Sequence, residues 1–129
     1  MAHILVADDD IEQVTVQRRL LEALGHEVDT ALSPGETLRQ LERCPPGLIV
    51  MDLRFPTAEA GLALIRGIHE AGCRPPVIVL SGWPDDLYGT PEEKLVARIV
   101  VKGSVRALFQ AIGELIPGTG CATPALPPG

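Results

Sequence analysis

Three consecutive carboxylates follow the first apolar run of the chain, in the stretch HILVADDD. Asp8, Asp9 and Asp10 come directly after residues 4–7, and Asp52 ends a second apolar run. Two like charges about 4 Å apart repel by about 1 kcal/mol in water and by about 4 kcal/mol near a protein surface. Carboxylates clustered in this way therefore indicate that a positive group lies among them.

Two further polar side chains, Ser81 and Lys102, end the next two apolar runs. Together with the carboxylates, they suit phosphoryl chemistry. Mg²⁺ prefers carboxylate oxygens and would relieve the repulsion among Asp8, Asp9 and Asp52. A carboxylate can attack phosphorus and form an aspartyl phosphate. The metal, the lysine and the hydroxyl would each bind one oxygen of the transferred group, whose charge is spread over its oxygens.

Short strands and amphipathic helices alternate along the chain. Continuous runs of Val, Ile and Leu are typical of strands buried on both faces of a parallel sheet, and they occupy residues 4–7, 48–51, 77–80 and 99–101. The alternating segment 26–32 predicts an edge strand with Val28, Thr30 and Leu32 on one side. The repeated β-α order predicts an α/β sandwich with a parallel sheet, in which the strand-end polar groups meet at one edge.

Periodicity and end signals place the helices between these strands. Apolar residues at helical spacing predict helices over 11–24, 34–43, 59–71 and 105–116. Ser33 and Glu36 form a capping box for the second helix, and Asp10 is interpreted as the cap of the first. Two prolines restrict the segment 84–97, which leaves room for one short helix near 91–97.

The composition fits one globular domain. The chain has 129 residues, 46% hydrophobic and 22% charged, near the globular average. Its net charge of −6 disfavours direct binding to nucleic acid or to an anionic membrane. The three cysteines form no CxxC or Cys/His motif, which favours reduced thiols in a cytoplasmic protein. We find no signal peptide and no apolar run long enough to span a membrane.

Four motifs in register resemble those of a known family. LVADDD, LIVMDLRFP, VIVLSG and VVKG are similar to the motifs of the receiver domain of two-component response regulators, the CheY-like superfamily. The resemblance covers about residues 2–116. It implies a flavodoxin-like (βα)5 three-layer sandwich with a five-stranded parallel sheet of order 2-1-3-4-5. We expect a receiver domain over 1–116, and a flexible tail over 117–129, which is rich in Gly and Pro.

The resemblance also assigns roles to the strand-end residues. It implies that Asp52 accepts a phosphoryl group and that Ser81 and Lys102 assist the reaction by holding that group. It implies four protein ligands for Mg²⁺, which are Asp8, Asp9, Asp52 and the backbone carbonyl of Arg54. The donor would be a sensor histidine kinase or a histidine phosphotransfer protein, and a change of surface shape would signal to a downstream protein target. A homodimer is a further possible assembly of this chain.

Some positions depart from the family pattern. Ile99 stands where a switch aromatic is common, and Gly103 follows the lysine where proline is common. The loop before Gly61 is one residue longer than usual. Trp83 lies two residues after Ser81, at a position where family members vary and the rate of dephosphorylation is tuned. We hypothesise that the indole shields the phosphoryl group from water.

Other interpretations of the same residues are simpler. Asp8 and Asp9 could merely cap a helix, Ser81 could belong to a turn, and Lys102 could be a solvated surface lysine. The chain could then be a pseudo-receiver, a protein-binding module that phosphorylation does not regulate. A phosphatase of the haloacid-dehalogenase type needs a second aspartate where Arg54 stands. We expect no enzyme activity beyond slow self-phosphorylation from small donors and slow autodephosphorylation.

Overall fold

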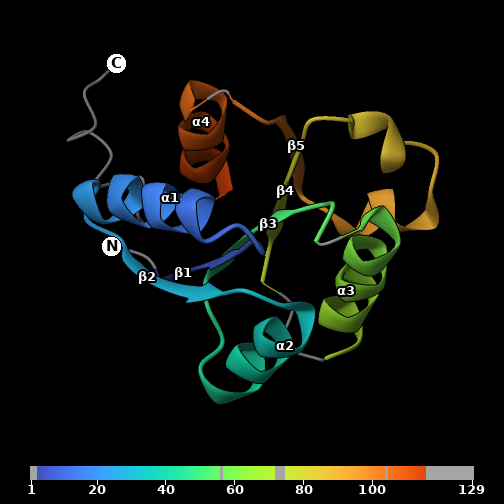
Figure 1. Ribbon diagram of the computed structural model, residues 1–129, viewed down its shortest axis with the longest axis horizontal. Helices are drawn as coiled ribbons and strands as arrows, with labels where there is room; N and C mark the ends of the chain where they lie inside the picture. The colour runs from blue at the N-terminus through green and yellow to red at the C-terminus, as the bar shows by residue number, and fades with distance from the viewer. Residues whose placement is uncertain (1–2, 56, 72–74, 104, 116–129) are drawn as a thin grey trace.

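The computed structural model describes residues 3–55, 57–71, 75–103 and 105–115. Within these residues the chain forms five β-strands, four α-helices and two 3-10 helices (Figure 1). In chain order they are β1 His3–Ala7, α1 Ile11–Ala23, β2 Glu27–Ala31, α2 Pro34–Arg43, β3 Leu48–Asp52, α3 Ala58–Glu70, β4 Val77–Ser81, η1 Pro84–Asp86, η2 Pro91–Leu95, β5 Arg98–Val101 and α4 Val105–Leu115. The predicted tail over 117–129 lies outside the described residues.

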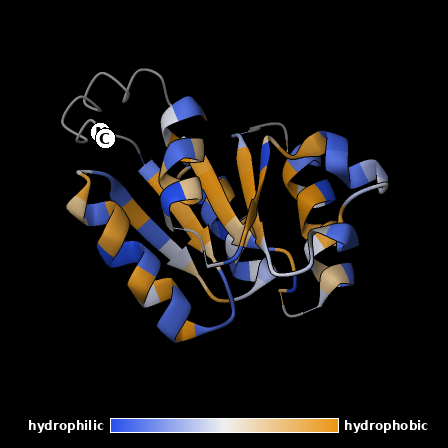
Figure 2. Cartoon of the chain, turned by 90° about the horizontal axis from the view of Figure 1, so that it is seen from above, coloured by the Kyte–Doolittle hydropathy of each residue, from blue (hydrophilic) through white to orange (hydrophobic). Residues whose placement is uncertain are grey.

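The five strands form one parallel sheet of order β2-β1-β3-β4-β5. Helices α1 and α4 cover one face, and α2 and α3 cover the other (Figure 1). The strands are mostly hydrophobic, and the helices turn their hydrophobic sides towards them (Figure 2). The predicted fold class, a flavodoxin-like α/β sandwich with strand order 2-1-3-4-5, is confirmed.

The helix starts follow the capping signals. A side-chain oxygen of Asp10 accepts a hydrogen bond from the N–H of Glu12 at 2.9 Å, and the Ser33 hydroxyl accepts one from the N–H of Glu36 at 3.1 Å. The Glu36 carboxylate accepts in turn from the N–H of Leu32 at 2.6 Å, one residue before the expected partner. Both predicted caps are thus confirmed, and they fix where the chain leaves the sheet edge.

The edge strand β2 is shorter than the predicted segment 26–32. Val28 is buried against α1, whereas Leu32 lies beyond the end of the strand and keeps 41% of its surface exposed. Thr30 and Leu32 both line a hollow beside α1, so these side chains do share one side. Among the described residues, β2 is the last strand at this side of the sheet, so these two side chains are only partly covered.

The connection between β4 and β5 differs from the prediction. The short helix expected near 91–97 is present as the 3-10 helix η2, but a second 3-10 helix, η1, precedes it, and Leu87 is fully buried between the two. Pro84 and Pro91 each begin one of the short helices, and Gly89 at φ +84° separates them with a left-handed turn. Neither piece is long enough for the repeated i→i−4 hydrogen bonds of an α-helix.

Candidate functional site

The strand register brings the carboxylates together. Ala7 of β1 pairs with Met51 of β3. Asp8, which directly follows β1, and Asp52, the last residue of β3, therefore lie at the same edge of the sheet. Oxygen atoms of Asp8, Asp9 and Asp52 all lie within 4.8 Å of one another. Asp8 and Asp52 are buried, whereas Asp9 is exposed. The predicted cluster is therefore present, and it opens to solvent on the side of Asp9.

The Asp8 carboxylate is buried and only half satisfied. Its Oδ1 accepts a hydrogen bond from the N–H of Asp10 at 3.0 Å. Its Oδ2 is the one buried side-chain polar atom, within the described part of the chain, that has no hydrogen-bond partner. Burial raises the pKa of Asp8 to about 6, against the effect of the Asp10 N–H, and the charge of Asp52 adds to the rise. An unpaired buried oxygen is costly, and a bound cation would satisfy it.

Lys102 balances part of this negative charge. It directly follows β5, and its Nζ donates to Oδ2 of Asp52 at 2.7 Å. Burial lowers the pKa of Lys102, but the hydrogen bond to Asp52 and the charge of that carboxylate outweigh burial and raise it above its ordinary value. One ammonium faces three carboxylates, so the site retains a negative charge that favours a further cation.

The Ser81 hydroxyl lies at the same edge. Ser81 ends β4 opposite Val101, and its backbone carbonyl accepts the N–H of Lys102 at 3.0 Å. Its hydroxyl oxygen accepts the N–H of Trp83 at 2.9 Å. A hydroxyl also donates one hydrogen bond, so Ser81 can still donate to an oxygen bound between β3 and β5.

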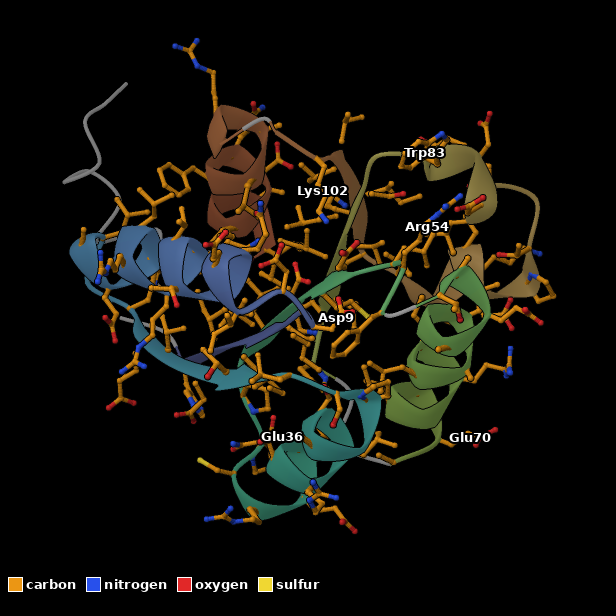
Figure 3. All side chains as sticks on the ribbon, viewed as in Figure 1. Asp9, Glu36, Arg54, Glu70, Trp83 and Lys102 are labelled. Atoms are coloured by element: carbon orange, nitrogen blue, oxygen red, sulfur yellow. The ribbon has the colours of Figure 1, made fainter. Side chains whose placement is uncertain are left out.

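The Arg54 side chain connects the loop after β3 to η1. Its Nε donates to Oδ2 of Asp86 at 2.9 Å, and its guanidinium lies over the Trp83 ring, 4.6 Å from the ring centroid. Figure 3 shows Arg54 and Trp83 together at the end of η1. Cation–π contacts of this kind contribute about 0.5–1 kcal/mol at exposed sites. Asp86 was not among the predicted site residues, because no local pattern relates it to Arg54, 32 residues away in the sequence.

Two glycines explain local features of the site. A Cβ on Gly61 would lie 1.8 Å from the carbonyl oxygen of Leu53, so the first turn of α3 packs directly on the backbone that follows Asp52. Gly103 has φ +97°, which proline cannot adopt because its ring holds φ near −65°. The absence of proline after Lys102 therefore suits this backbone. Ile99 packs, partly buried, against the core cluster on the α2 and α3 face.

The comparison with protein families identifies the chain. Residues 4–102 match the family model of the response regulator receiver domain, and the chain belongs to this family. Receiver domains are signalling modules of two-component systems, and the predicted class of protein is thereby confirmed. Among the described residues, no helix has the length and apolarity that crossing a membrane requires.

Curated and solved relatives agree with this family. The transcriptional regulatory protein GlrR of Escherichia coli is 30% identical over 124 residues, which is 95% of this chain and 28% of GlrR. A receiver domain structure from Clostridium thermocellum has a TM-score of 0.81 at 26% identity, covering 94% of this chain and 98% of that one. The response regulator TrrA of Thermotoga maritima, solved with Mg²⁺-BeF, has a TM-score of 0.80 at 23% identity, covering 89% and 99%.

Proposed function

We propose that this receiver domain accepts a phosphoryl group on Asp52 in a Mg²⁺-dependent reaction. The observation that carries the proposal is the partly balanced carboxylate cluster. Three carboxylates lie within 4.8 Å of one another, one buried oxygen of Asp8 is unpaired, and Lys102 bonds to Asp52 at 2.7 Å. A cluster that served only to cap α1 would need Asp10 alone, since Asp10 already bonds the first free N–H groups of that helix.

The donor set fits a hard cation. Asp8, Asp9, Asp52 and the backbone carbonyl of Arg54 offer only oxygen atoms, which Mg²⁺ prefers. We infer that these groups hold the metal, and the unpaired Oδ2 of Asp8 supports this assignment. The metal, when bound, would neutralise one phosphoryl oxygen. The relative TrrA was solved with Mg²⁺-BeF, which accords with a magnesium site in this chain.

Asp52, Lys102 and Ser81 would carry out the other steps of phosphoryl transfer. A carboxylate oxygen of Asp52 attacks the phosphorus of a phosphohistidine on a sensor kinase or phosphotransfer protein, and the P–N bond breaks with the imidazole as leaving group. Lys102, now bonded to Asp52, would pair with one phosphoryl oxygen. Ser81 would donate its hydroxyl hydrogen to another. In this proposal the protein chiefly orients the group and neutralises its charge.

Trp83 and Arg54 would limit the access of water to the phosphoryl group. The backbone N–H of Trp83 is held by Ser81, and its ring is held by Arg54, which Asp86 anchors in turn. Trp83→Ala should therefore shorten the lifetime of the phosphorylated protein several-fold, and Trp83→Phe should do so less. An unchanged rate of phosphate loss in Trp83→Ala would contradict the shield.

Signalling would follow from a change of surface shape around the modified edge. Phosphorylation adds about −1.5 to −2 charges to a site that already holds three carboxylates. The chain spans 28% of the length of GlrR, so the downstream partner is itself a proposal. We propose a protein target rather than nucleic acid, because the net charge is −6, and we propose that the receiver unit covers residues 1–116.

A pseudo-receiver remains the second candidate. Ile99 and Gly103 favour it, because neither supplies the aromatic or proline group common in the family, and Ile99 is packed against the core. In that case partner binding, and not phosphate, would regulate the protein. The two candidates differ in whether the carboxylate site binds its ligands at all.

The fluorescence of Trp83, the only tryptophan of the chain, can test the proposal. We would add Mg²⁺ and then beryllofluoride, a mimic of the aspartyl phosphate, to the wild type, to Asp52→Asn and to Glu70→Gln. Glu70 lies at the far end of α3 and serves as the matched carboxylate control (Figure 3). We expect saturable responses in the wild type and the control, with the beryllofluoride response lost in Asp52→Asn. No response in any protein would favour the pseudo-receiver.

A further inference from the structure

A second group of reactive side chains lies at the opposite edge of the sheet from Asp52. His3 begins β1, Asp29 lies in β2, and Cys44 directly follows α2. The His3 Nε2 and the Asp29 Oδ2 are 2.6 Å apart, and the His3 Nδ1 lies 3.9 Å from the Cys44 Sγ. A hydrogen bond of 2.8 Å from the N–H of Gly47 to the His3 carbonyl holds the loop after Cys44 against β1.

The carboxylate fixes the tautomer of the imidazole. Ionised Asp29 only accepts hydrogen bonds, so its partner nitrogen, Nε2 of His3, carries the proton. The other nitrogen, Nδ1, then presents its lone pair towards the thiol of Cys44. A nucleophile, a base and a group that orients the base are the three parts of an activated nucleophile. Here they come from three separate segments of the chain.

The position of Cys44 at the end of α2 means that its thiol needs His3 as a base to become a nucleophile. Cys44 is exposed, so reagents can reach its sulfur. It also caps the C-terminal end of α2, where its N–H donates to the carbonyl of Gln40. The negative end of a helix disfavours a thiolate, so the helix itself does not activate Cys44. A protonated His3, stabilised by Asp29, would offset this effect by pairing with the thiolate sulfur.

We propose that Cys44 is a nucleophilic thiol and a site of modification by small disulfides. Nδ1 of His3 takes the proton of the thiol, and the sulfur attacks one sulfur atom of the disulfide. The new S–S bond forms as the old one breaks, and the second sulfur leaves as a thiolate that takes up the proton from His3. The Cys44 sulfur is oxidised and the leaving sulfur is reduced, so no other reactant is needed.

The proposed thiol site is spatially separate from the carboxylate site. His3 is the first residue of β1 and Asp8 directly follows that strand, so at about 3.3 Å per residue the two edges are about 16 Å apart. An adduct on Cys44 would therefore leave Asp52 open to its ligands. The inference does not depend on the proposed function, because no group of one site belongs to the other.

The rate at which a small disulfide modifies Cys44 tests the proposal. We would treat the full chain with glutathione disulfide at neutral pH and follow the adduct on Cys44 by peptide mass spectrometry. The folded wild type would be compared with the same chain unfolded in urea, with His3→Gln and with His69→Gln. His69 is an exposed histidine of α3 and serves as the matched control. Circular dichroism would establish that each variant is folded.

We expect Cys44 to react roughly tenfold faster in the folded wild type than in the unfolded chain. His3→Gln should reduce the rate to about that of the unfolded chain, and His69→Gln should leave it unchanged. Asp29→Asn should slow the reaction several-fold, because an amide N–H directed at Nε2 favours the other tautomer. If His3→Gln does not fold, Asp29→Asn takes its place. The proposal would be overturned if Cys44 reacted no faster in the folded wild type than in the unfolded chain. It would also be overturned if folded His3→Gln and Asp29→Asn reacted as fast as the wild type.

Discussion

The connections before β4 and the connection after it are built differently. Before β4 the chain returns through three α-helices of 10 to 13 residues, each capped by a side chain, and their buried faces pack on the sheet. After β4 it returns through η1 and η2, which have three and five residues. The buried side chain of Leu87 and two ion pairs hold this second connection: Arg54 binds Asp86 at 2.9 Å, and Arg66 binds Glu92 at 2.5 Å.

The residues of the candidate site come from both the regular and the irregular part of the molecule. The carboxylates Asp8, Asp9 and Asp52 lie at the ends of β1 and β3 in the regular part, where apolar packing fixes the backbone. Lys102 lies beyond the irregular connection. Apolar packing is close and tolerates little displacement, whereas ion pairs at a partly exposed surface are weak. Close apolar packing therefore holds the acidic side of the site, whereas the connection that carries Trp83 relies in part on surface ion pairs.

The largest effect on stability should come from adding a side-chain carbon at Gly61, where α3 packs closely on the backbone of Leu53. Gly61→Ala places a Cβ 1.8 Å from the carbonyl oxygen of Leu53, so α3 must move away from the backbone next to Asp52. We expect a loss of about 3 kcal/mol or more in the free energy of unfolding, measured by urea titration.

Gly113→Ala provides the matched control. Gly113 lies in α4, and a Cβ there would have no neighbour within 4 Å. This substitution should stabilise the protein by about 0.5–1 kcal/mol, because alanine favours the helix. Equal effects of the two substitutions would contradict a tightly packed regular part.

The next effect should come from the buried carboxylate. Burial raises the pKa of Asp8 from 3.8 to about 6, so the folded protein binds more protons than the unfolded chain between these values. The stability of the metal-free protein should therefore fall as pH rises from about 4 to about 6, by at most about 3 kcal/mol. Asp8→Asn should remove this fall and should stabilise the metal-free protein at neutral pH, as measured by thermal unfolding in a chelator. An unaltered pH profile in the variant would contradict the assignment to Asp8.

The smallest effect on stability should come from removing the ion pair between Arg66 and Glu92 in the connection between β4 and β5. The hydrogen bond from Arg66 lowers the pKa of Glu92 below 4.5, so this pair stabilises the protein above that pH and is lost as pH falls through the folded pKa. Glu92→Gln should speed amide hydrogen exchange in residues 84–97 at neutral pH, with little change in β1 and β3.

Arg18→Gln is the matched control for this experiment. It removes the exposed Arg18–Glu22 pair within α1, and such pairs contribute about 0–1 kcal/mol. It should leave exchange in residues 84–97 unchanged. Uniformly faster exchange across the sheet in Glu92→Gln would show that the two parts unfold together and would remove the contrast between them.

The sequence was sufficient for the parts of the molecule that repeat a local pattern. Four apolar runs and one alternating segment predicted the five strands, and a parallel sheet gathers the residues that end its strands at one edge. Asp8, Asp9 and Asp52 could therefore be placed together before their distances were known. The caps Asp10 and Ser33 were also predictable, because a cap and its partner lie within three residues of each other.

Contacts between distant segments were not predictable in this way. Asp86 anchors Arg54 from η1, and Glu92 binds Arg66 of α3, but charged residues on a surface have no spacing that identifies their partners. The short 3-10 helix η1 was not predicted, because the three residues that begin at Pro84 give no periodic pattern. Tertiary packing determined these features.

Asp52 is the proposed phosphoryl acceptor, and intact mass after treatment with a small phosphoryl donor tests this role most directly. We would incubate the wild type, Asp52→Asn and Glu70→Gln with acetyl phosphate, with and without Mg²⁺, and measure each mass. We predict a gain of one phosphoryl group in the wild type and in Glu70→Gln when Mg²⁺ is present, and no gain in Asp52→Asn. An unmodified wild type in the presence of Mg²⁺, or the same gain in Asp52→Asn, would contradict the assignment of Asp52 as the phosphoryl acceptor.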